Sequence, residues 1–553
     1  MEHVTLGAMK KSFEGNIVDV IRKKIQPGRI ILREGKIERI ERIKSDSPTF
    51  IMPGFVDAHV HVESTMVTPV EFSRMAVRHG TIAAVSDPHE IGNVLGEEGI
   101  RFMVENGKKT PFKYLFGAPS CVPATPFETA GATLDYRAIE KLLDLDGIGY
   151  LAEMMNFPGV IHRDPDVMKK IEVAKNKGVP IDGHAPGLRG EGLKKYVDAG
   201  ITTDHECTDR QEAWEKIEAG MKILIREGSA AKNFEELIPL MKIAPERLMF
   251  CTDDLHPDEL SKGHINQLVR RAISMGYDVL NVLRAASLNA VQHYGLDMGL
   301  LRSGDPADFI IVNDLKEMRV METYIDGIPV YQDGKIHIPS VSTEKVNEFS
   351  ERKIKSSEIK VKRESDRMQV IEAKDGSLIT GRKLISLPGA GPDVESDVEN
   401  DLIKIVVVNR YDPTLKPAVG FISGFGIRKG AMASSISHDS HHVVCVGVSD
   451  GHILETIQWI FSQKGGIALH DGKEVLGLPL PIAGLMTAVP VDEVGEKYQQ
   501  LNRIAENLGS ILHAPFMTLS FMALLVIPSL KIGDRGLFDV DAFSFTPLFV
   551  SSS

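Results

Sequence analysis

Short apolar runs alternate with amphipathic stretches through the middle of the chain, from residue 51 to residue 303. Each apolar run has the length of a buried strand and ends in polar, often ionisable residues, as in TIAAVSDPHE, VPIDGHAPG and RLMFCTDDLHPD. The intervening stretches, such as DPDVMKKIEVAKNKG and LKKYVDAG, have the spacing of amphipathic helices. Strand–helix alternation over about 250 residues is typical of a (β/α)8 barrel, a TIM-like fold whose chemistry lies at the carboxyl ends of the strands. We therefore predict an α/β protein with such a barrel over residues 51–303.

The flanking segments have a different pattern. Residues 1–50 and 304–340 contain short alternating stretches punctuated by Gly and Asp, which predicts strands. We expect the two segments to pair into one small β domain. Residues 341–367 are rich in charge, which favours a linker or a solvated helix rather than a core. Apolar runs such as LIKIVVVNR and HHVVCVGVSD return in residues 368–553, where we predict a C-terminal α/β domain.

Two histidines, His59 and His61, stand at the end of the apolar run that follows a Pro-Gly turn. In a strand, residues two apart point to the same side. Both imidazoles would therefore face the same way and would suit one divalent ion. The alternative is a pair of hydrogen-bonded histidines near a surface, and this motif alone leaves both interpretations open.

Further ionisable residues follow the other predicted strands. They are Asp87, His89, Glu90, Glu153, His184, His205, Asp253 and Asp254. Each one alone has an ordinary explanation, such as a satisfied buried histidine or a helix cap. A metal centre explains them jointly, because all of them would lie at strand ends of one barrel.

The pattern predicts a centre with two divalent ions. The expected ligands are His59, His61, Glu153, His184, His205 and Asp253. The first histidine pair and Asp253 would hold one ion, the later pair would hold the other, and Glu153 could bridge them. Mixed imidazole and carboxylate ligands suit Zn²⁺, Mn²⁺ or Fe²⁺. Two ions that share a water generate hydroxide near neutral pH, and an adjacent carboxylate can carry its proton to a leaving group, which is hydrolysis.

Composition and charge limit the binding partners and the cellular compartment that we expect. The formal net charge is -12, which disfavours binding to a nucleic-acid backbone. The four cysteines are widely spaced and form no CxxC motif, which fits a reducing cytoplasm. The most apolar stretch, FMTLSFMALLVIPSL, contains a proline and is too short to span a bilayer comfortably. We expect a cytoplasmic protein with no membrane or nucleic-acid partner, and a homo-oligomer.

The chain resembles the amidohydrolase superfamily and, within it, the adenine deaminase family. The general motifs are PGFVDAHVH, GHAPG, DHE and CTDD, and the narrower ones are HVESTM, SDPHEIGNVLG and LAEMMNFPGV. The C-terminal stretches GFGIRKGAMASSISHDSHH and KGGIALHDGKEVLGLPLPIAGLM are similar to that family's second domain. Many superfamily relatives bridge their metals with a carboxylated lysine. The stretch GYLAEMMNF has no lysine, and Glu153 stands where the bridge would come, which fits the deaminase subtype.

The resemblance implies hydrolytic deamination of adenine to hypoxanthine and ammonia in purine salvage, with Mn²⁺ the favoured ion. Hydroxide would attack C6 of the purine, and Asp253 would accept its proton and deliver it to the departing amino group. Glu90 or His89 would protonate ring nitrogen N1 or fix the ring edge. Glu90 has a structural alternative, as a helix cap or as a partner of a metal-bound histidine. Asp87 and Asp254 are expected as further substrate contacts, and His256 as a loop residue.

Two other functions stay open at this point. One is another amidohydrolase reaction, such as amide deacetylation or deamination of a different base. The other is a metal-free relative that serves as a scaffold.

The cluster SHDSHH, which contains His438, Asp439, His441 and His442, is expected to be structural or to cover the active site, because the following VVCVGV predicts a strand.

Overall fold

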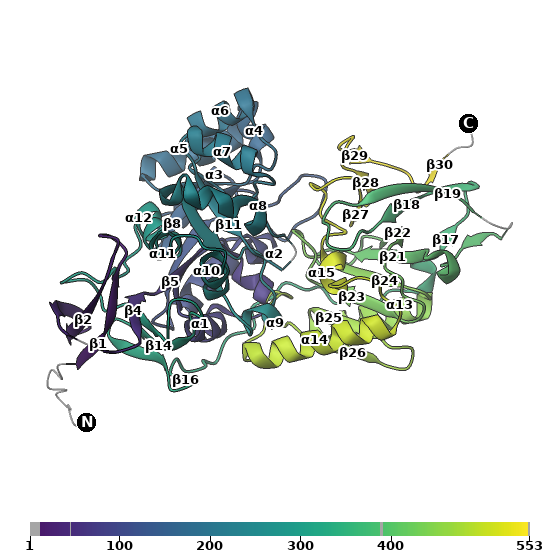
Figure 1. Cartoon of the computed structure of the whole chain (residues 1–553). Coiled ribbons are helices and arrows are strands. Elements are labelled where there is room, and N and C mark those ends of the chain that lie inside the picture. Colours follow the sequence, from purple (N-terminus) through teal and green to yellow (C-terminus); the bar gives the residue numbers. More distant parts are fainter. Residues whose placement is uncertain (1–10, 45, 230, 388–390, 551–553) are drawn as a thin grey trace. The chain divides into compact units, whose positions relative to one another are not determined.

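The computed structural model describes residues 11–44, 46–229, 231–387 and 391–550. The chain forms two compact units (Figure 1). Unit 1 comprises residues 11–87, Phe102–Ser120 and Asp135–Ser342. Unit 2 comprises Pro88–Arg101, Cys121–Leu134 and the residues from Thr343 onward. Both units are therefore built from segments that are far apart in the sequence.

Parallel strands form the centre of unit 1. A five-stranded sheet contains β5 (Phe55–Val60), β6 (Thr81–Ser86), β7 (Lys113–Ala118), β8 (Ile148–Met154) and β9 (Ile181–Gly183) in that order. A three-stranded sheet contains β10 (Thr203–Asp204), β11 (Lys222–Arg226) and β12 (Leu248–Cys251). Past the end of β12, the amide of Asp253 donates to the carbonyl of His59 at 2.9 Å, so this end lies beside β5. The expected alternation of buried strands and helices is confirmed.

Helices follow these strands along the chain (Figure 1). They are α1 (Pro69–Arg78), α2 (His89–Gly107), α3 (Tyr136–Leu142), α4 (Phe157–Ile161), α5 (Pro165–Lys177), α6 (Gly190–Asp198), α7 (Arg210–Glu218), α8 (Phe234–Leu237), α9 (Pro257–Leu260), α10 (Ile265–Ser274), α11 (Val279–Ala285) and α12 (Leu288–Tyr294). Helix α5 illustrates the local causes. Asp164 caps its first turn by accepting from two backbone amides, and Gly178 ends it in the left-handed conformation.

The flanking strands of unit 1 form one eight-stranded sheet. Its order is β16 (Lys335–Ile336), β15 (Ile328–Gln332), β14 (Val320–Ile325), β13 (Phe309–Val312), β4 (Phe50–Pro53), β1 (Lys11–Asp19), β2 (Lys24–Arg33) and β3 (Lys36–Arg42). Strand β4 joins the strands of the N-terminal segment to those of residues 309–336, because Ile51 pairs with Ile17 on one side and with Ile311 on the other. These three residues share one buried apolar cluster. Residues 1–10 of the expected β domain lie outside the described residues.

Unit 2 is built on a nine-stranded sheet. Its strands are β19 (Gly381–Ser386), β18 (Arg367–Glu372), β22 (Ala418–Ser423), β21 (Ile403–Val408), β24 (Val443–Gly447), β23 (Ala431–Ser434), β25 (Gly466–His470) and β26 (Val475–Pro479), with β30 (Phe549–Val550) beside β18. Helix α13 (Asp450–Gln463) contributes Ile453, Ile457 and Ile460 to the core over this sheet. The same core contains Ile359, so the charged segment 341–367 supplies a fully buried side chain.

The remaining elements of unit 2 are two helices, one pair of strands and one small sheet. They are α14 (Val491–Asn507), α15 (Pro515–Ser520), the pair β17 (Val361–Lys362) and β20 (Asp393–Val394), and the sheet of β27 (Leu530–Gly533), β28 (Gly536–Asp539) and β29 (Ser544–Phe545). The apolar stretch FMTLSFMALLVIPSL begins within α15, whose six residues are all buried. Within the part of the chain that the structure describes, the helices lack the length and apolar character needed to cross a bilayer.

Helix α2 belongs to both units. Its first turns, through Arg101, are part of unit 2, and the rest is part of unit 1. The helix is kinked at Gly96, which has φ 58° and ψ -139°, far from helical values. A residue with a side chain is strained in this conformation, so glycine is required at the kink.

Candidate metal centre

The candidate ligands of unit 1 gather at the carboxyl ends of its parallel strands. His59 lies in β5 and His61 directly follows it, Glu153 lies near the end of β8, and Asp253 follows β12. His184 and His205 each come directly after a strand, β9 and β10 respectively. All of these side chains are buried except that of His184, which is partly exposed. The strands thus bring together residues that are separated by up to about 190 positions in the chain.

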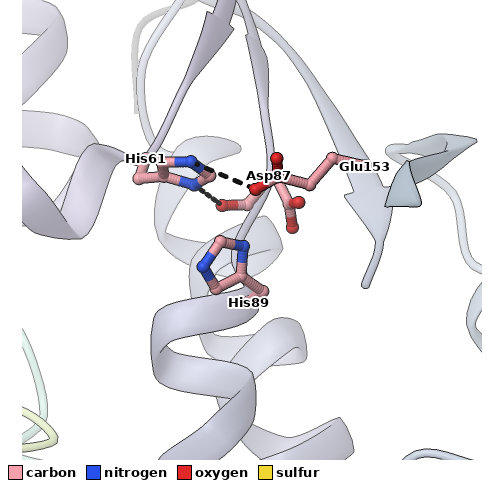
Figure 2. A group of neighbouring side chains, drawn as sticks. All are labelled: His61, Asp87, His89 and Glu153. Atoms are coloured by element: carbon pink, nitrogen blue, oxygen red, sulfur yellow. Dashed lines mark hydrogen bonds and ion pairs between the residues drawn. The ribbon is translucent and has the colours of Figure 1, made fainter. Parts of the chain in front are cut away.

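The first group consists of His59, His61 and Asp253, whose candidate ligand atoms all lie within 4.8 Å of one another. Nε2 of His61 is 3.0 Å from Oδ1 of Asp253, and Nε2 of His59 is 3.7 Å from the same oxygen. Nδ1 of His61 donates to the backbone carbonyl of Asp87 at 3.0 Å (Figure 2). This bond places a proton on Nδ1 of His61, and Nε2 is the ring nitrogen that faces the carboxylate of Asp253.

Glu153 lies between the two histidine pairs. Its Oε1 is 3.4 Å from Nε2 of His61, and Figure 2 marks this contact with a dashed line. Its Oε2 is 2.7 Å from Nδ1 of His184 and 3.2 Å from Nε2 of His205. One carboxylate therefore presents one oxygen to each pair, which is the arrangement that a bridging ligand requires.

The second group contains His184, His205 and Glu206, a residue that the sequence analysis did not select. The imidazoles of His59 and His205 stack at 4.0 Å between ring centres, with 19° between their planes. Both ring nitrogens of His59 are buried and make no hydrogen bond among the described residues. Such buried, unsatisfied nitrogens are costly in an apo protein and are accounted for when one of them ligates an ion.

The donor set fits divalent metal ions. Nitrogen and oxygen ligands that each lie about 2.0–2.2 Å from an ion are spaced by roughly 3–4 Å, which is the range of the distances given above. Three carboxylates surround the histidines, those of Glu153 and Asp253, which are buried, and that of Glu206, which is partly exposed. The guanidinium of Arg226 offsets only part of this negative charge. The surplus of negative charge favours a cation. Zn²⁺, Mn²⁺ and Fe²⁺ all accept such mixed ligands.

The charges of the group shift its pKa values. Burial raises the pKa of Glu153, but His184 and His205 outweigh it and hold this pKa well below its usual value. Burial likewise opposes ionisation of Asp253, and Arg226 is the largest of the influences that hold its pKa well below the usual value. Burial lowers the pKa of His184, yet the carboxylates of Glu206 and Glu153 raise it to about 9. The carboxylates are therefore ionised and strongly attract positive charge.

Arg226 is the main residue that sequence reasoning missed. It ends β11, and its Nη1 donates to Oδ2 of Asp253 at 2.5 Å. The same guanidinium is paired with Glu206, through Nη2 at 3.1 Å and through a second, shorter contact. Arg226 thus orients the oxygen of Asp253 that does not face the histidines. A charged residue at the end of the apolar run KILIR was the available signal.

The other predicted site residues differ in their surroundings. Asp87 follows β6 and is buried, and it offers a carboxylate oxygen within 4.8 Å of candidate ligand atoms of His61 and Glu153. Asp254 accepts a hydrogen bond from Oγ of Ser64 at 2.5 Å. His256 is the residue before the first turn of α9. In unit 2, His89 and Glu90 form the first turn of α2, and Nε2 of His89 is 3.6 Å from Oε1 of Glu90.

Comparison with known proteins identifies the family to which the chain belongs. Residues 50–330 match the profile of the amidohydrolase family, and residues 377–544 match the adenine deaminase C-terminal domain. The chain is therefore a hydrolase of the amidohydrolase family, whose matched segment contains every candidate ligand described above.

Relatives that match over their full length identify the family within this class of hydrolases. The chain is 52% identical over 541 residues to an adenine deaminase of Salinibacter ruber, covering 98% of this chain and 99% of the relative. It is 51% identical over 554 residues to an adenine deaminase of Methanosarcina mazei, with the same coverage. An adenine deaminase of a Sulfurovum species is 52% identical over 533 residues, covering 96% of this chain and 98% of the relative. The chain belongs to the adenine deaminase family.

Proposed function

We propose that this protein hydrolyses adenine to hypoxanthine and ammonia, as a metal-dependent enzyme of purine salvage. The observation that carries the proposal is the identity of about half of all residues with adenine deaminases over nearly the full length of both chains. The buried cluster of imidazoles and carboxylates in unit 1 supplies chemistry suited to hydrolysis. We also infer that the eight parallel strands of unit 1 close a (β/α)8 barrel, because Asp253 hydrogen bonds beside β5.

The proposed centre holds two divalent ions. His59, His61 and Asp253 would hold one ion, His184 and His205 would hold the other, and Glu153 would bridge them. When bound, such ions lower the pKa of water and supply a nucleophile near neutral pH. Mn²⁺ is favoured, with Fe²⁺ or Zn²⁺ as alternatives.

Asp253 is the proposed base and acid of the reaction. It takes a proton from the attacking water and delivers it to the amino group that leaves C6 of the purine, so that adenine and water give hypoxanthine and ammonia. Its hydrogen bond from Arg226 supports this role, because the carboxylate is held ionised with one oxygen directed at the histidines. A base must be unprotonated before it can act, and the lowered pKa of Asp253 provides for this.

Other roles rest on the family resemblance. Glu90 or His89 is proposed to protonate ring nitrogen N1 or to fix the ring edge, and Asp87 and Asp254 are proposed as substrate contacts. A cytoplasmic location is proposed as well, supported by four buried cysteines that form no disulfide with one another. We also propose a homo-oligomer, on family resemblance alone.

The test is ammonia release from adenine by the protein reconstituted with Mn²⁺, beside the variant His59→Ala/His61→Ala. We expect robust release by the wild type and a loss of at least 100-fold in the variant, because a ligand pair of one ion is removed. His162→Ala is the matched control, since His162 is exposed. It should retain wild-type activity.

Two outcomes would count against the proposal. If metal-loaded wild type releases no ammonia from adenine, the substrate assignment is wrong, and a panel of amides and other bases comes next. If the double variant stays active while the wild type is active, the metal assignment of His59 and His61 is wrong. Counting bound metal on both proteins separates these cases from simple failure to load the ions.

A further inference from the structure

Glu90 is enclosed by histidines within unit 2. Nδ1 of His438 donates to Oε1 of Glu90 at 2.5 Å, and Nε2 of His441 donates to Oε2. His89 lies beside the same carboxylate. All four side chains are buried. Each carboxylate oxygen therefore receives its own imidazole N–H, from a loop that is about 350 residues away in the sequence.

The tautomer of His441 is fixed by the backbone. The amide of Ser437 donates to Nδ1 of His441 at 3.3 Å, so Nδ1 is an acceptor and the ring proton resides on Nε2, facing Glu90. Burial lowers the pKa of His441 to about 4, which agrees with a neutral ring. His441 is thus a neutral donor of fixed direction.

The loop that carries both histidines, residues 437–442, is tied down at several points. The ring of His438 stacks on Phe521 with 4.4 Å between ring centres, and the hydroxyl of Tyr411 donates to the carbonyl of Ser440 at 2.7 Å. The fully buried guanidinium of Arg410 donates to the carbonyl of His441 at 3.4 Å. This shell holds both imidazoles in place and resembles the support that functional side chains require.

The backbone of His441 is itself unusual. Its φ is 54°, a left-handed value that is unfavourable for a residue other than glycine. The amide of His441 donates to the carbonyl of Ser437 at 2.7 Å, which maintains the turn. Strained residues of this kind are retained where a side chain must be directed precisely at a partner, and here the partner is Glu90.

We infer that His438 and His441 are positioning residues for the reaction, which hold both oxygens of Glu90 and fix its orientation and charge. The inference rests on the proposed function. It also distinguishes the two candidates for protonating the purine ring. A carboxylate that accepts two imidazole N–H groups is stabilised as an anion and has no proton to give. Glu90 then acts as the acceptor that anchors neighbouring groups, and His89 is left as the ring's proton donor.

Burial raises the pKa of Glu90, but His438, His441 and His89 outweigh it and hold this pKa well below its usual value. The carboxylate also lies in the first turn of α2, where negative charge is favoured by the helix dipole. Both observations agree with a permanently ionised Glu90.

The experiment is a double-mutant cycle in the metal-loaded enzyme, with ammonia release from adenine as the readout. His441→Ala should lower kcat/KM by about 10–100-fold in the wild-type background, as is typical for residues that orient a functional group. In the Glu90→Gln background the same substitution should cost less than about twofold, because its effect passes through Glu90. His441→Gln keeps an N–H donor at the same reach and should recover most of the activity.

The matched control is His442→Ala. His442 is buried next to His441, but its Nε2 faces Asp534 at 3.6 Å and not Glu90. Its effect on kcat/KM should be the same in both backgrounds. If His441→Ala prevents folding, as judged by circular dichroism, His438→Asn against His438→Leu provides the same comparison, because asparagine retains a donor that mimics Nδ1–H.

The outcomes distinguish the positioning role of His438 and His441 from the proposed deaminase function. Active wild type with equal losses from His441→Ala in both backgrounds would overturn the inference and leave the proposed function in place. Failure of His441→Gln to recover activity, in a folded protein, would overturn it too. A wild type with no activity on adenine would overturn the proposed function, and the inference would fall with it.

Discussion

At the scale of single residues, Arg226 keeps Asp253, the candidate base, ionised and oriented. Its guanidinium is shared between Asp253 and Glu206, and all three groups are largely removed from water. Burial would otherwise favour protonation of both carboxyl groups. Removing one partner of such a buried group leaves the other charges uncompensated, which costs far more than the loss of an exposed ion pair.

The substitution Arg226→Met tests this dependence. We expect kcat/KM for adenine to fall by about 10–100-fold, because Asp253 loses the group that orients it and keeps it ionised. Bound metal should be counted in parallel, since Asp253 is also a proposed ligand.

Arg271→Met is the control for this substitution. Arg271 also pairs with two glutamates, Glu227 at 3.0 Å and Glu235, but it is more than a third exposed. Exposed pairs contribute at most about 1 kcal/mol, so its loss should leave activity unchanged. Equal losses in the two variants would contradict the role given to Arg226.

The same residues show which features of the site can be predicted from the sequence alone. Polar residues that end apolar runs locate the strand ends, and so the candidate ligands could be selected from the order of residues. Their roles remain predictions. Arg226 was not selected because the apolar pattern identifies where a strand ends but not which side chains meet across neighbouring strands. The partners of Glu90 were missed for the same reason, since His438 and His441 are contributed by a distant loop.

At the scale of elements, helix α2 shows a conflict between local pattern and tertiary structure. Helix α2 follows strand β6, in line with the predicted alternation of strands and helices, but it bends at Gly96, and its residues beyond Arg101 belong to the other unit. Strands and capped helices such as α5 follow from local residues. The kink does not follow from the spacing of apolar residues, although the glycine at residue 96 permits it.

Gly96→Ala should therefore destabilise the protein by about 1–3 kcal/mol. Its φ is positive, and an added Cβ would lie 2.9 Å from Cβ of Ala132, within the same unit. The measurement is the midpoint of thermal unfolding. Gly451→Ala is the control, because Gly451 lies in the first turn of α13 and its Cβ would meet no atom within 4 Å. That variant should be neutral or slightly more stable, and a similar loss in both would refute the strain at Gly96.

At the scale of the whole molecule, the candidate centre links distant parts of unit 1. Its ligands lie on or after β5, β8, β9, β10 and β12. They come together only in the folded chain, so an ion that binds them stabilises the native state over the unfolded one.

Removal of metal should therefore lower stability as well as activity. At a metal concentration about 100 times the dissociation constant, binding contributes about 2.7 kcal/mol. We expect the unfolding midpoint of chelator-treated protein to rise by several degrees when Mn²⁺ is restored. The variant His59→Ala/His61→Ala should show a much smaller rise. An identical rise in that variant would mean that the stabilising ion binds elsewhere.

The discontinuous make-up of both units has a consequence for synthesis. A ribosome adds about 5–20 residues each second, so the 348 residues that separate Glu90 from His438 take roughly 20–70 s to appear. Strand β4 likewise emerges long before its partner β13. Until their partners appear, the nascent chain carries an unpaired strand edge at β4 and an acidic group, Glu90, without its imidazole donors. A polypeptide released before residue 438 therefore lacks the loop on which unit 2 closes around Glu90.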